Sequence, residues 1–268
     1  MAAIQLLPAA GGAAMSYLVY CIVDGGRQEP RRKLRFLGYP RASIMVRAAG
    51  LGAVVSRKSA ADASPDVARL LVYSKIVEWF NADGAVIPMR YGCIFDALKE
   101  VERFLTDHKQ QYSQLLQELD GRVEMSARVT LDGLLVPARS NGRRPLKPPA
   151  EFARAEAGPG VAYLAQRWAS YAIREEWENR RDEIRKSLCS TASGTFVRWT
   201  SEYGEQDGRG VLSVHFLVPR ERIAAFSEAL HCASAPAISS LVVTGPWPAY
   251  NFVSPPAPGL SGRDAGDV

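Results

Sequence analysis

Few residues in this 268-residue chain have the types and spacing that catalysis requires. The best placed of its three histidines, His215, alternates within an apolar stretch that is typical of a β-strand. Glu175 and Glu176 are adjacent carboxylates, but nothing in the sequence places an opposing acid or base near them, as general acid–base catalysis would need. The sequence contains no phosphate-binding loop, dinucleotide-binding motif or nucleophile elbow. We therefore predict a protein that is not an enzyme and that needs no cofactor.

The cysteines do not form a recognisable metal site or disulfide framework. None belongs to a Cys-x-x-Cys pair, and none has a histidine at the spacing of a zinc site. His231 directly precedes Cys232, but neighbouring residues on a helix point to different faces. We expect free thiols, no bound metal and a reducing, cytoplasmic location for all four cysteines, which are Cys21, Cys93, Cys189 and Cys232.

Composition and charge are those of an ordinary globular protein, with 47% hydrophobic and 23% charged residues. The net charge of +5 permits a nucleic acid or an acidic partner without requiring one. No charged residue precedes Asp24, but Pro8 and Gly11-Gly12 interrupt this stretch and no basic residue opens it. This pattern disfavours a secretion signal or a membrane anchor. We expect a loose extension over residues 1–14 and no membrane partner.

The first half of the chain predicts a strand, a hairpin and several helices. Residues 95–119 have the apolar spacing of a helix in two pieces, and Ser64-Pro65-Asp66 is typical of the start of an earlier helix. That earlier helix has an apolar face made of Leu70, Tyr73, Val77 and Phe80. Strands are expected at Ser16–Val23, Ser43–Arg47, Leu51–Ser56 and Val86–Met89.

From Arg122 onward the expected order is β-α-β-β-α-β, which is the order of a ferredoxin-like sheet with two helices on one face. The strands are expected at Arg122–Leu131, Gly194–Thr200, Gly210–Val218 and Ile238–Thr244, with a polar turn at Glu202–Arg209. The helices are expected at Val161–Leu188 and after Pro219, and Val136–Pro149 is expected to be a loop. The fold class is therefore α+β. We expect an N-terminal domain at 15–120, a ferredoxin-like domain at 121–253 with a flexible loop at 136–158, and a disordered tail at 254–268.

An unusual aromatic stretch, GPWPAYNFV, lies near the C-terminus at Gly245–Val253. Prolines on both sides of Trp247 restrict the backbone, and two further aromatic residues, Tyr250 and Phe252, follow closely. The aromatic side chains could cap the core of their own domain. They could instead form a rigid apolar edge that binds a partner. The residues alone leave both interpretations open.

Two blocks of the sequence resemble the gas vesicle protein GvpF/GvpL family. Val86–Phe95 reads VIPMRYGCIF and is similar to that family's apolar-Leu-Pro-x-Arg-Phe-Gly-Thr-x-Phe block. Gly245–Val253 is close to the family's C-terminal Gly-Pro-Trp-Pro-Pro-Tyr-Ser-Phe-Val. Tyr17–Val23 also matches the family's first strand, and Gly160–Leu164 matches the start of its long charged helix. The resemblance runs from about Met15 to Val253.

The resemblance implies two α+β domains and a role in building gas vesicles, the hollow protein-walled organelles that give cells buoyancy. It implies an accessory or minor structural protein that binds the hydrophobic shell protein and other assembly factors, in the cytoplasm and at the gas vesicle. A partner with an exposed sheet edge and rigid aromatic side chains could cover an apolar shell subunit. The candidate partner-binding residues are Pro88, Arg90, Tyr91, Phe95, Trp247, Pro248, Tyr250 and Phe252. The sequence leaves open whether the protein also binds further copies of itself.

The alternative from another functional class is a basic RNA-binding module on a ferredoxin-like sheet. The relevant strand begins with Arg209-Gly210 and ends with Phe216, as the RNA-binding strand of such modules does. Its two stacking positions, however, are occupied by Val211 and Ser213 instead of aromatic residues. Without a stacking platform, we expect nucleic acid to be an unfavoured partner.

Overall fold

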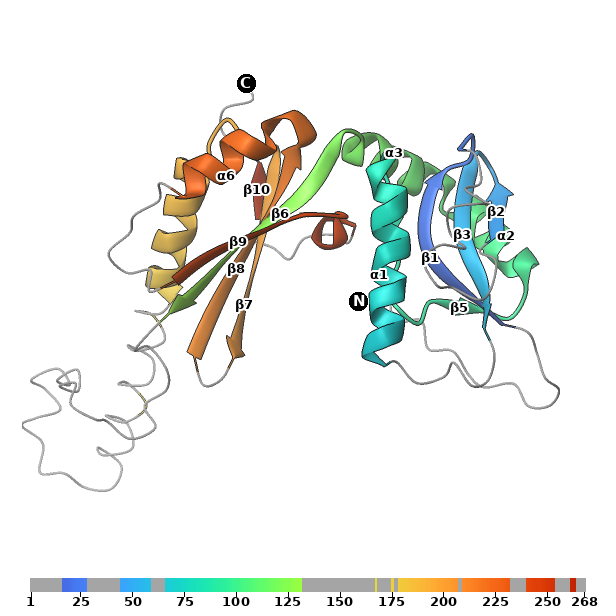
Figure 1. The fold of residues 1–268 in the computed structure, drawn as a ribbon, viewed down its shortest axis with the longest axis horizontal. Coiled ribbons are helices and arrows are strands. Elements are labelled where there is room, and N and C mark those ends of the chain that lie inside the picture. The colour runs from blue at the N-terminus through green and yellow to red at the C-terminus, as the bar shows by residue number, and fades with distance from the viewer. Residues whose placement is uncertain are drawn as a thin grey trace, which may run out of the picture. The chain divides into compact units, whose positions relative to one another are not determined.

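The structure is a computed structural model of the chain, and it describes residues 16–27, 44–58, 66–131, 167, 175, 178–206, 209–231, 240–253 and 261–263. Its helices and strands are labelled in Figure 1. The chain divides into two compact units, each with its own sheet. The first unit contains Met1–Val123 and Trp247–Ser254, and the second contains Glu124–Pro246 and Pro255–Val268. The expected α+β class is confirmed, whereas the expected domain limits stay a prediction.

The first unit is built on a five-stranded sheet in the order β2-β3-β1-β4, with β5 also paired to β1. β1 lies between β3 and the short strands β4 and β5, and all of these pairs are antiparallel. Every β1 residue from Tyr17 to Val23 is buried, because this apolar, β-branched strand is covered on both faces. The strands are β1 (Ser16–Asp24), β2 (Ile44–Ala48), β3 (Leu51–Lys58), β4 (Ile87–Pro88) and β5 (Ile94–Phe95).

The expected hairpin between β2 and β3 turns at Ala49 and Gly50. These residues have φ angles of 54° and 83°, as a two-residue hairpin turn with positive φ at both central positions requires. The turn also touches the end of β1, because Gly25 N donates a hydrogen bond of 2.9 Å to Gly50 O. A side chain at Gly25 would place its Cβ only 2.7 Å from that same oxygen. The turn therefore fixes the register of an edge strand and anchors the end of the central strand.

Three helices cover the sheet of the first unit: α1 (Val67–Ala82), α2 (Leu98–Asp107) and α3 (Lys109–Leu119). The side chain of Asp66 caps α1 by accepting a hydrogen bond of 2.8 Å from Arg69 N. α1 packs on one face of the sheet, whereas α2 contacts β2 and β3 and α3 contacts β1 (Figure 1). The break between α2 and α3 at His108 confirms the expected helix in two pieces.

Two expectations for this unit were wrong in part. Leu70 was expected on the buried face of α1, but its side chain is 43% exposed, because the described sheet packs against this helix only from Val72 and Tyr73 onward. Phe95 was expected in a helix, but it lies in β5, where pairing with Tyr17 holds the backbone extended. α2 starts three residues later, at Leu98.

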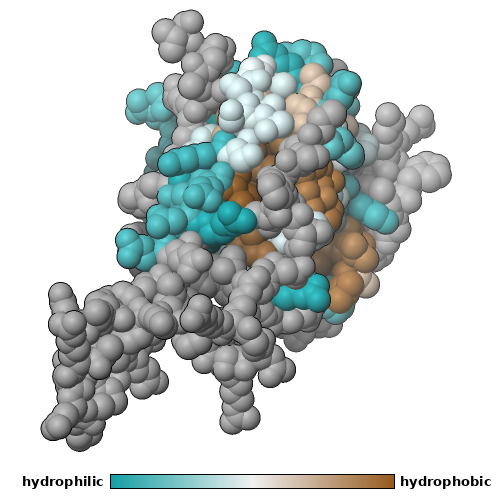
Figure 2. Space-filling model, turned by 90° about the vertical axis from the view of Figure 1, so that its left-hand side faces the viewer, coloured by the Kyte–Doolittle hydropathy of each residue, from teal (hydrophilic) through white to brown (hydrophobic). Residues whose placement is uncertain are grey.

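The second unit has a five-stranded sheet in the order β10-β7-β8-β6-β9. The helix at residues 178–191 and α6 (Ile223–His231) pack on one face of it, and the one-turn helix η3 (Arg220–Arg222) precedes α6 (Figure 1). Figure 2 shows this side of the molecule, where hydrophobic residues gather centrally and hydrophilic residues border them. The strands are β6 (Arg122–Leu131), β7 (Arg198–Gln206), β8 (Arg209–Pro219), β9 (Ser240–Trp247) and β10 (Ser261–Arg263).

The core of this unit follows the expected alternation along β6. Met125, Ala127 and Val129 point to the helices, where they meet Leu188 and Phe226. The charged helix also packs onto the sheet. Two of its guanidinium groups lie over aromatic rings of β7, at 4.8 Å for Arg181 over Tyr203 and 4.9 Å for Arg185 over Trp199.

Several strand limits differ from the sequence expectations. The strand expected from Gly194 begins only at Arg198. Glu202–Gln206 was expected in a turn, but these residues continue β7 and pair with β8, because a neighbouring backbone supplies hydrogen bonds that outweigh a weak strand propensity. β9 was expected to end at Thr244, but it continues to Trp247. Part of the expected disordered tail, Ser261–Arg263, forms β10 and pairs with β7. The expected extension at 1–14 and the loop at 136–158 lie outside the described residues, as does most of the first half of the helix at 161–188.

Candidate partner-binding surface

The expected partner-binding residues come from two stretches of the chain, and both stretches belong to the first unit. We call Val86–Phe95 the first block and Trp247–Ser254 the aromatic segment. In the first block, Pro88 lies opposite Cys21 of β1, and Phe95 lies opposite Tyr17. The first block therefore runs along the central strand as two short strands joined by a loop.

The hydroxyl group of Tyr73, on α1, fixes the first block to the sheet. It lies 2.6 Å from Met89 O, 3.0 Å from Tyr20 O and 3.3 Å from Val19 O. Tyr20 is the residue at which β1 shifts register against β3. Its carbonyl oxygen also accepts a hydrogen bond of 2.9 Å from Met89 N. The side chain of Tyr73 therefore links α1 to the central strand β1 and to the segment after β4.

Tyr73 is also the centre of an aromatic group that joins α1, the central strand and the first block. Its ring centroid is 5.0 Å from that of Tyr20 and 5.3 Å from that of Tyr91. Burial raises the pKa of Tyr73 well above the usual range, and the nearby Tyr250 raises it further. Tyr91 belongs to the first block and Tyr250 to the aromatic segment, so residues of both stretches lie near Tyr73.

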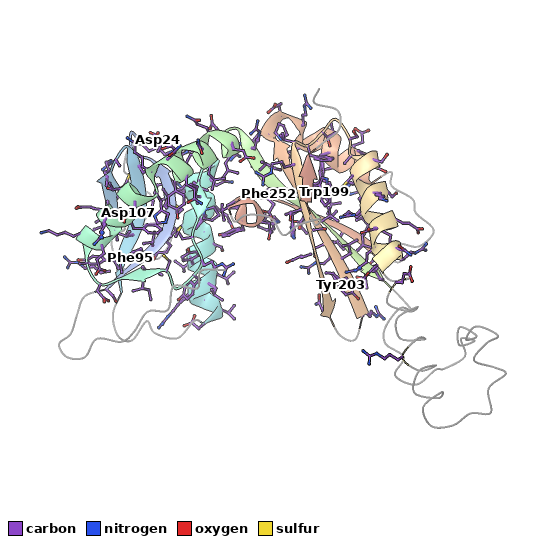
Figure 3. The ribbon with its side chains drawn as sticks, turned by 180° about the vertical axis from the view of Figure 1, so that it is seen from behind. Asp24, Phe95, Asp107, Trp199, Tyr203 and Phe252 are labelled. Atoms are coloured by element: carbon purple, nitrogen blue, oxygen red, sulfur yellow. The ribbon has the colours of Figure 1, made fainter. Side chains whose placement is uncertain are left out.

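The aromatic segment buries some of its side chains and exposes others. Pro248, Ala249 and Phe252 are buried, and Phe252 is only 2% exposed. Trp247 and Tyr250 are 41% and 38% exposed. The one-turn helix η4 (Tyr250–Phe252), in which Figure 3 labels Phe252, follows from backbone hydrogen bonds of 2.7 Å to Pro248 O and 3.2 Å to Ala249 O. The segment is therefore anchored in the core and presents two aromatic rings to solvent.

The remaining candidates of the first block differ in exposure. Arg90 is exposed, whereas Phe95 is half-buried and begins a row of rings along α2 and α3. Phe95 lies 5.2 Å from Phe104, Phe104 lies 4.5 Å from His108, and His108 stacks on Tyr112 at 5.3 Å. The row attaches β5 to the helices. Tyr91 is half-buried and Pro88 is buried, so this block contributes more to the core than to the surface.

Sequence reasoning missed an exposed apolar stripe on α1. Val67, Leu70 and Leu71 are 73%, 43% and 56% exposed, and their spacing places them on neighbouring positions of the helix surface. A signal was present, because the first turns of this helix are apolar on more than one side. A helix that is apolar all round is normally buried. The exposed stripe therefore indicates a surface that another chain could cover.

The second unit contains a serine, a histidine and two glutamates in one group on the sheet. His215 Nδ1 lies 2.8 Å from Ser126 Oγ and 3.3 Å from Glu124 Oε1, and His215 Nε2 lies 3.5 Å from Glu202 Oε1. A catalytic triad needs the serine on one ring nitrogen and a buried acid on the other. Here the buried Glu124 shares Nδ1 with the serine, and the side chain of Glu202 is 66% exposed. We interpret the group as cross-strand polar contacts of β6, β7 and β8.

Metal and membrane sites were also sought in the described part of the chain. It contains no group of three His, Cys, Asp or Glu side chains placed to hold a metal ion. No helix in the same residues has both the length and the apolar character that crossing a membrane requires.

A family model described as gas vesicle synthesis protein GvpL/GvpF matches residues 16–254 of the chain. This chain belongs to the GvpL/GvpF family. The match spans the first block and reaches the end of the aromatic segment, so the resemblance inferred from these stretches is confirmed. GvpL/GvpF proteins are gas vesicle proteins and are not a known enzyme family. Membership therefore implies a role in gas vesicle assembly and an association with gas vesicle components.

Relatives of known name agree with this assignment. Gas vesicle protein F of Streptomyces sp. (strain CB03234) is 26% identical over 241 residues, which are 89% of this chain and 100% of that protein. Gas vesicle protein L of the same strain is 28% identical over 172 residues, which are 62% of this chain and 61% of that protein.

Solved structures of the GvpL/GvpF family share the fold. The crystal structure of GvpF from Anabaena sp. PCC7120 has a TM-score of 0.62 and covers 91% of this chain and 100% of its own. The structure of GvpF from Microcystis aeruginosa has a TM-score of 0.63 and covers 90% of this chain and 99% of its own. Both are 14% identical in sequence, so they support the fold alone.

Proposed function

We propose that this protein is an accessory or minor structural protein of gas vesicle assembly that binds the hydrophobic shell protein and other assembly factors. It acts in the cytoplasm and at the gas vesicle, where it supports nucleation and formation of the vesicle and has no enzymatic role. Membership of the GvpL/GvpF family supports a role in gas vesicle assembly. The observation that carries the binding role is the aromatic segment, which exposes Trp247 and Tyr250 from a buried base.

The aromatic segment has the properties of a preorganised binding anchor. Trp and Tyr side chains offer large contact areas with few rotatable bonds, and they are common among residues that dominate binding energy. Pro248 and Phe252 are buried, so the backbone that carries the exposed rings is held in place before a partner arrives. Ordering this surface on binding therefore costs little conformational entropy.

The stripe on α1 supplies a second apolar contact in the same unit. Val67, Leu70 and Leu71 have the i, i+3, i+4 spacing by which one helix packs against another. Leu70 lies one helical turn before Tyr73, whose ring contacts Tyr91 of the first block and near which Tyr250 of the aromatic segment lies. A shell subunit with an apolar helix could pack along this stripe while its remaining apolar surface meets the rings.

We also infer that the two compact units are domains and that the second is ferredoxin-like. The strand order β7-β8-β6-β9, with two helices on one face, supports this inference. In this proposal the first domain ends at Val123 instead of residue 120 and also includes Trp247–Ser254, while Pro255–Val268 groups with the second domain.

The test is a pull-down of the tagged protein after co-expression with the shell protein, at low and high salt. An apolar contact should survive high salt, because screening weakens only charge interactions. The double variant Trp247→Ala with Tyr250→Ala should lose most of the shell protein. Tyr203→Ala is the matched control, because Tyr203 has a similar exposure of 42% but lies in the second unit.

Two results would contradict the proposal. If the double variant is folded, as circular dichroism can check, and still retains the shell protein, the proposed surface is wrong. If binding by the unaltered protein disappears at high salt, the contact depends on charged residues such as Arg90.

RNA binding gains no support from the described sheet. The two stacking positions, Val211 and Ser213, are 9% and 5% exposed, and neither is aromatic.

A further inference from the structure

β9 is an open edge of the second sheet. It stands at the end of the strand order, with β6 as its neighbour among the described strands. Val242 is 51% exposed, and Leu241 and Val243, which face the helices, are only partly buried. Within the described residues, no strand pairs with the backbone groups that point away from β6, and such groups can pair with another strand.

The other edge strands carry features that discourage pairing, whereas β9 carries almost none. β2 bears Arg47, and β10 has only three residues and includes Arg263. β4 and β5 have two residues each. β9 has eight residues, SLVVTGPW, and none of them is charged. The one residue of β9 that discourages pairing is Pro246, because it lacks an N–H group. Ser240–Thr244 is therefore the stretch of β9 that can pair.

We propose that β9 pairs in antiparallel orientation with β9 of a second copy of this chain, about a two-fold axis at Val242. The sequence of the pairing stretch is nearly symmetric about that residue. Val242 meets Val242 of the partner subunit, and Leu241 meets Val243 of the partner subunit. Ser240 meets Thr244 of the partner subunit. Aliphatic side chains thus face aliphatic ones and hydroxyl groups face hydroxyl groups, which are favourable cross-strand pairs.

A second copy fits this edge better than an unrelated strand for two reasons. A two-fold axis places Val242 opposite its own copy and brings its neighbours close to theirs, so a charged residue there would lie near a like charge. β9 has no charged residue, and it is the longest edge strand of the two sheets. The symmetric contact also closes on itself, because both open edges are used and no chain of subunits can grow from them.

The packing of the helix layer supports the same arrangement. Leu241 and Val243 border the core formed by Met125 and Phe226 but remain partly exposed at its rim. A neighbouring strand about 4.8 Å away would add its own Leu and Val side chains to that rim. The two cores would then become continuous under a sheet that crosses both subunits.

The test is sedimentation of the purified full-length protein over a range of concentrations. The average mass of the unaltered protein should rise from 29.3 kDa towards twice that value. Val242→Lys should weaken dimerisation roughly tenfold or more, because two like charges would face each other. Val67→Lys is the matched control: the same substitution on α1, at a side chain that is 73% exposed, should leave dimerisation unchanged.

A charge swap makes the test specific for the proposed register. Val242→Lys and Val242→Glu should each be monomeric alone and should form a mixed dimer when combined, because opposite charges then meet at the axis. The proposal is overturned if the unaltered protein stays monomeric, if Val242→Lys dimerises normally, or if the mixture stays monomeric. No shell protein is present, so these outcomes are independent of the proposed function.

Discussion

β1 and β9 are built from similar residues and occupy opposite positions in their sheets. β1 reads SYLVYCIVD and β9 reads SLVVTGPW, so both are mainly apolar and almost free of charge. Every residue of β1 from Tyr17 to Val23 is buried, whereas the exposed residues of β9 include Val242 at 51%. β1 has strands on both sides and helices over both faces of its sheet, while β9 has one described neighbour.

The difference shows that burial of a strand depends on what surrounds it more than on its own residue types. An apolar central strand is stabilised by packing on every side. The same residue types at an edge leave apolar surface and backbone groups exposed, which usually marks a surface that binds another chain. In this protein the central strand organises the unit that carries the aromatic segment, and the edge strand leads directly into that segment.

The largest expected change in stability comes from placing an aspartate in β1, and the same substitution in β9 is the comparison. Val19→Asp would bury a carboxyl group at a position with no exposed surface, and we expect a loss of about 4 kcal/mol or more in the free energy of unfolding. Val242→Asp should change it by less than about 0.5 kcal/mol. Denaturant unfolding, at concentrations low enough to keep the chains monomeric, measures both. Equal losses at the two positions would show that β9 is covered in solution.

A smaller loss of stability is expected at Gly245, where β9 lies close against β6. Gly245 has a φ angle of 125°, and a Cβ there would lie 2.7 Å from Met125 Sδ and 2.8 Å from Glu124 O. Gly245→Ala should therefore cost about 2–4 kcal/mol, through backbone strain and overpacking.

The matched control for this substitution is Gly204→Ala in β7. A Cβ at Gly204 would meet no atom within 4 Å, and its φ angle is ordinary. That variant should be neutral or slightly stabilising, by up to about 1 kcal/mol. Similar losses in both variants, measured by denaturant unfolding, would mean that the close approach at Gly245 does not exist in solution.

The sequence predicted the elements of both units well because their signals are local. The alternation along Arg122–Leu131 gives the limits of β6, and the turn at Ala49 gives the hairpin. The edge position of β9 could not be predicted, because the residues of a strand do not indicate on how many sides another strand pairs with it. β10 was missed for a related reason: a three-residue strand exists only because β7 offers it a partner.

The candidate surface could be predicted only in part. The sequence singled out the aromatic segment, but it could not decide which rings would be buried. The structure answers this residue by residue, with Phe252 in the core and Trp247 exposed. The exposed stripe at Leu70 was missed, because helical periodicity gives the direction of a side chain but not the extent of the sheet beneath it.

The smallest of the three effects concerns the hydroxyl group that ties α1 to the central strand. Tyr73→Phe removes the hydrogen bonds to Met89 O and Tyr20 O while keeping the ring. We expect the free energy of unfolding to fall by only about 1–2 kcal/mol, because the carbonyl oxygen of Tyr20 still accepts a hydrogen bond from Met89 N. Tyr203→Phe, at a side chain that is 42% exposed, is the control and should change stability by less than about 0.5 kcal/mol.

The pH dependence of this loss tests the burial of Tyr73 directly. Burial raises the pKa of Tyr73 in the folded protein above its ordinary value of 10.0. The unfolded chain therefore releases this proton at a lower pH than the folded protein does, and the stability contributed by neutral Tyr73 is complete below pH 10.0 and falls as the pH rises further. The stability difference between the unaltered protein and Tyr73→Phe should shrink above that pH, since the other tyrosines titrate alike in both. A difference that stays constant through the alkaline range would place the hydroxyl group in water and would contradict the hydrogen bonds that link α1 to the central strand and to Met89.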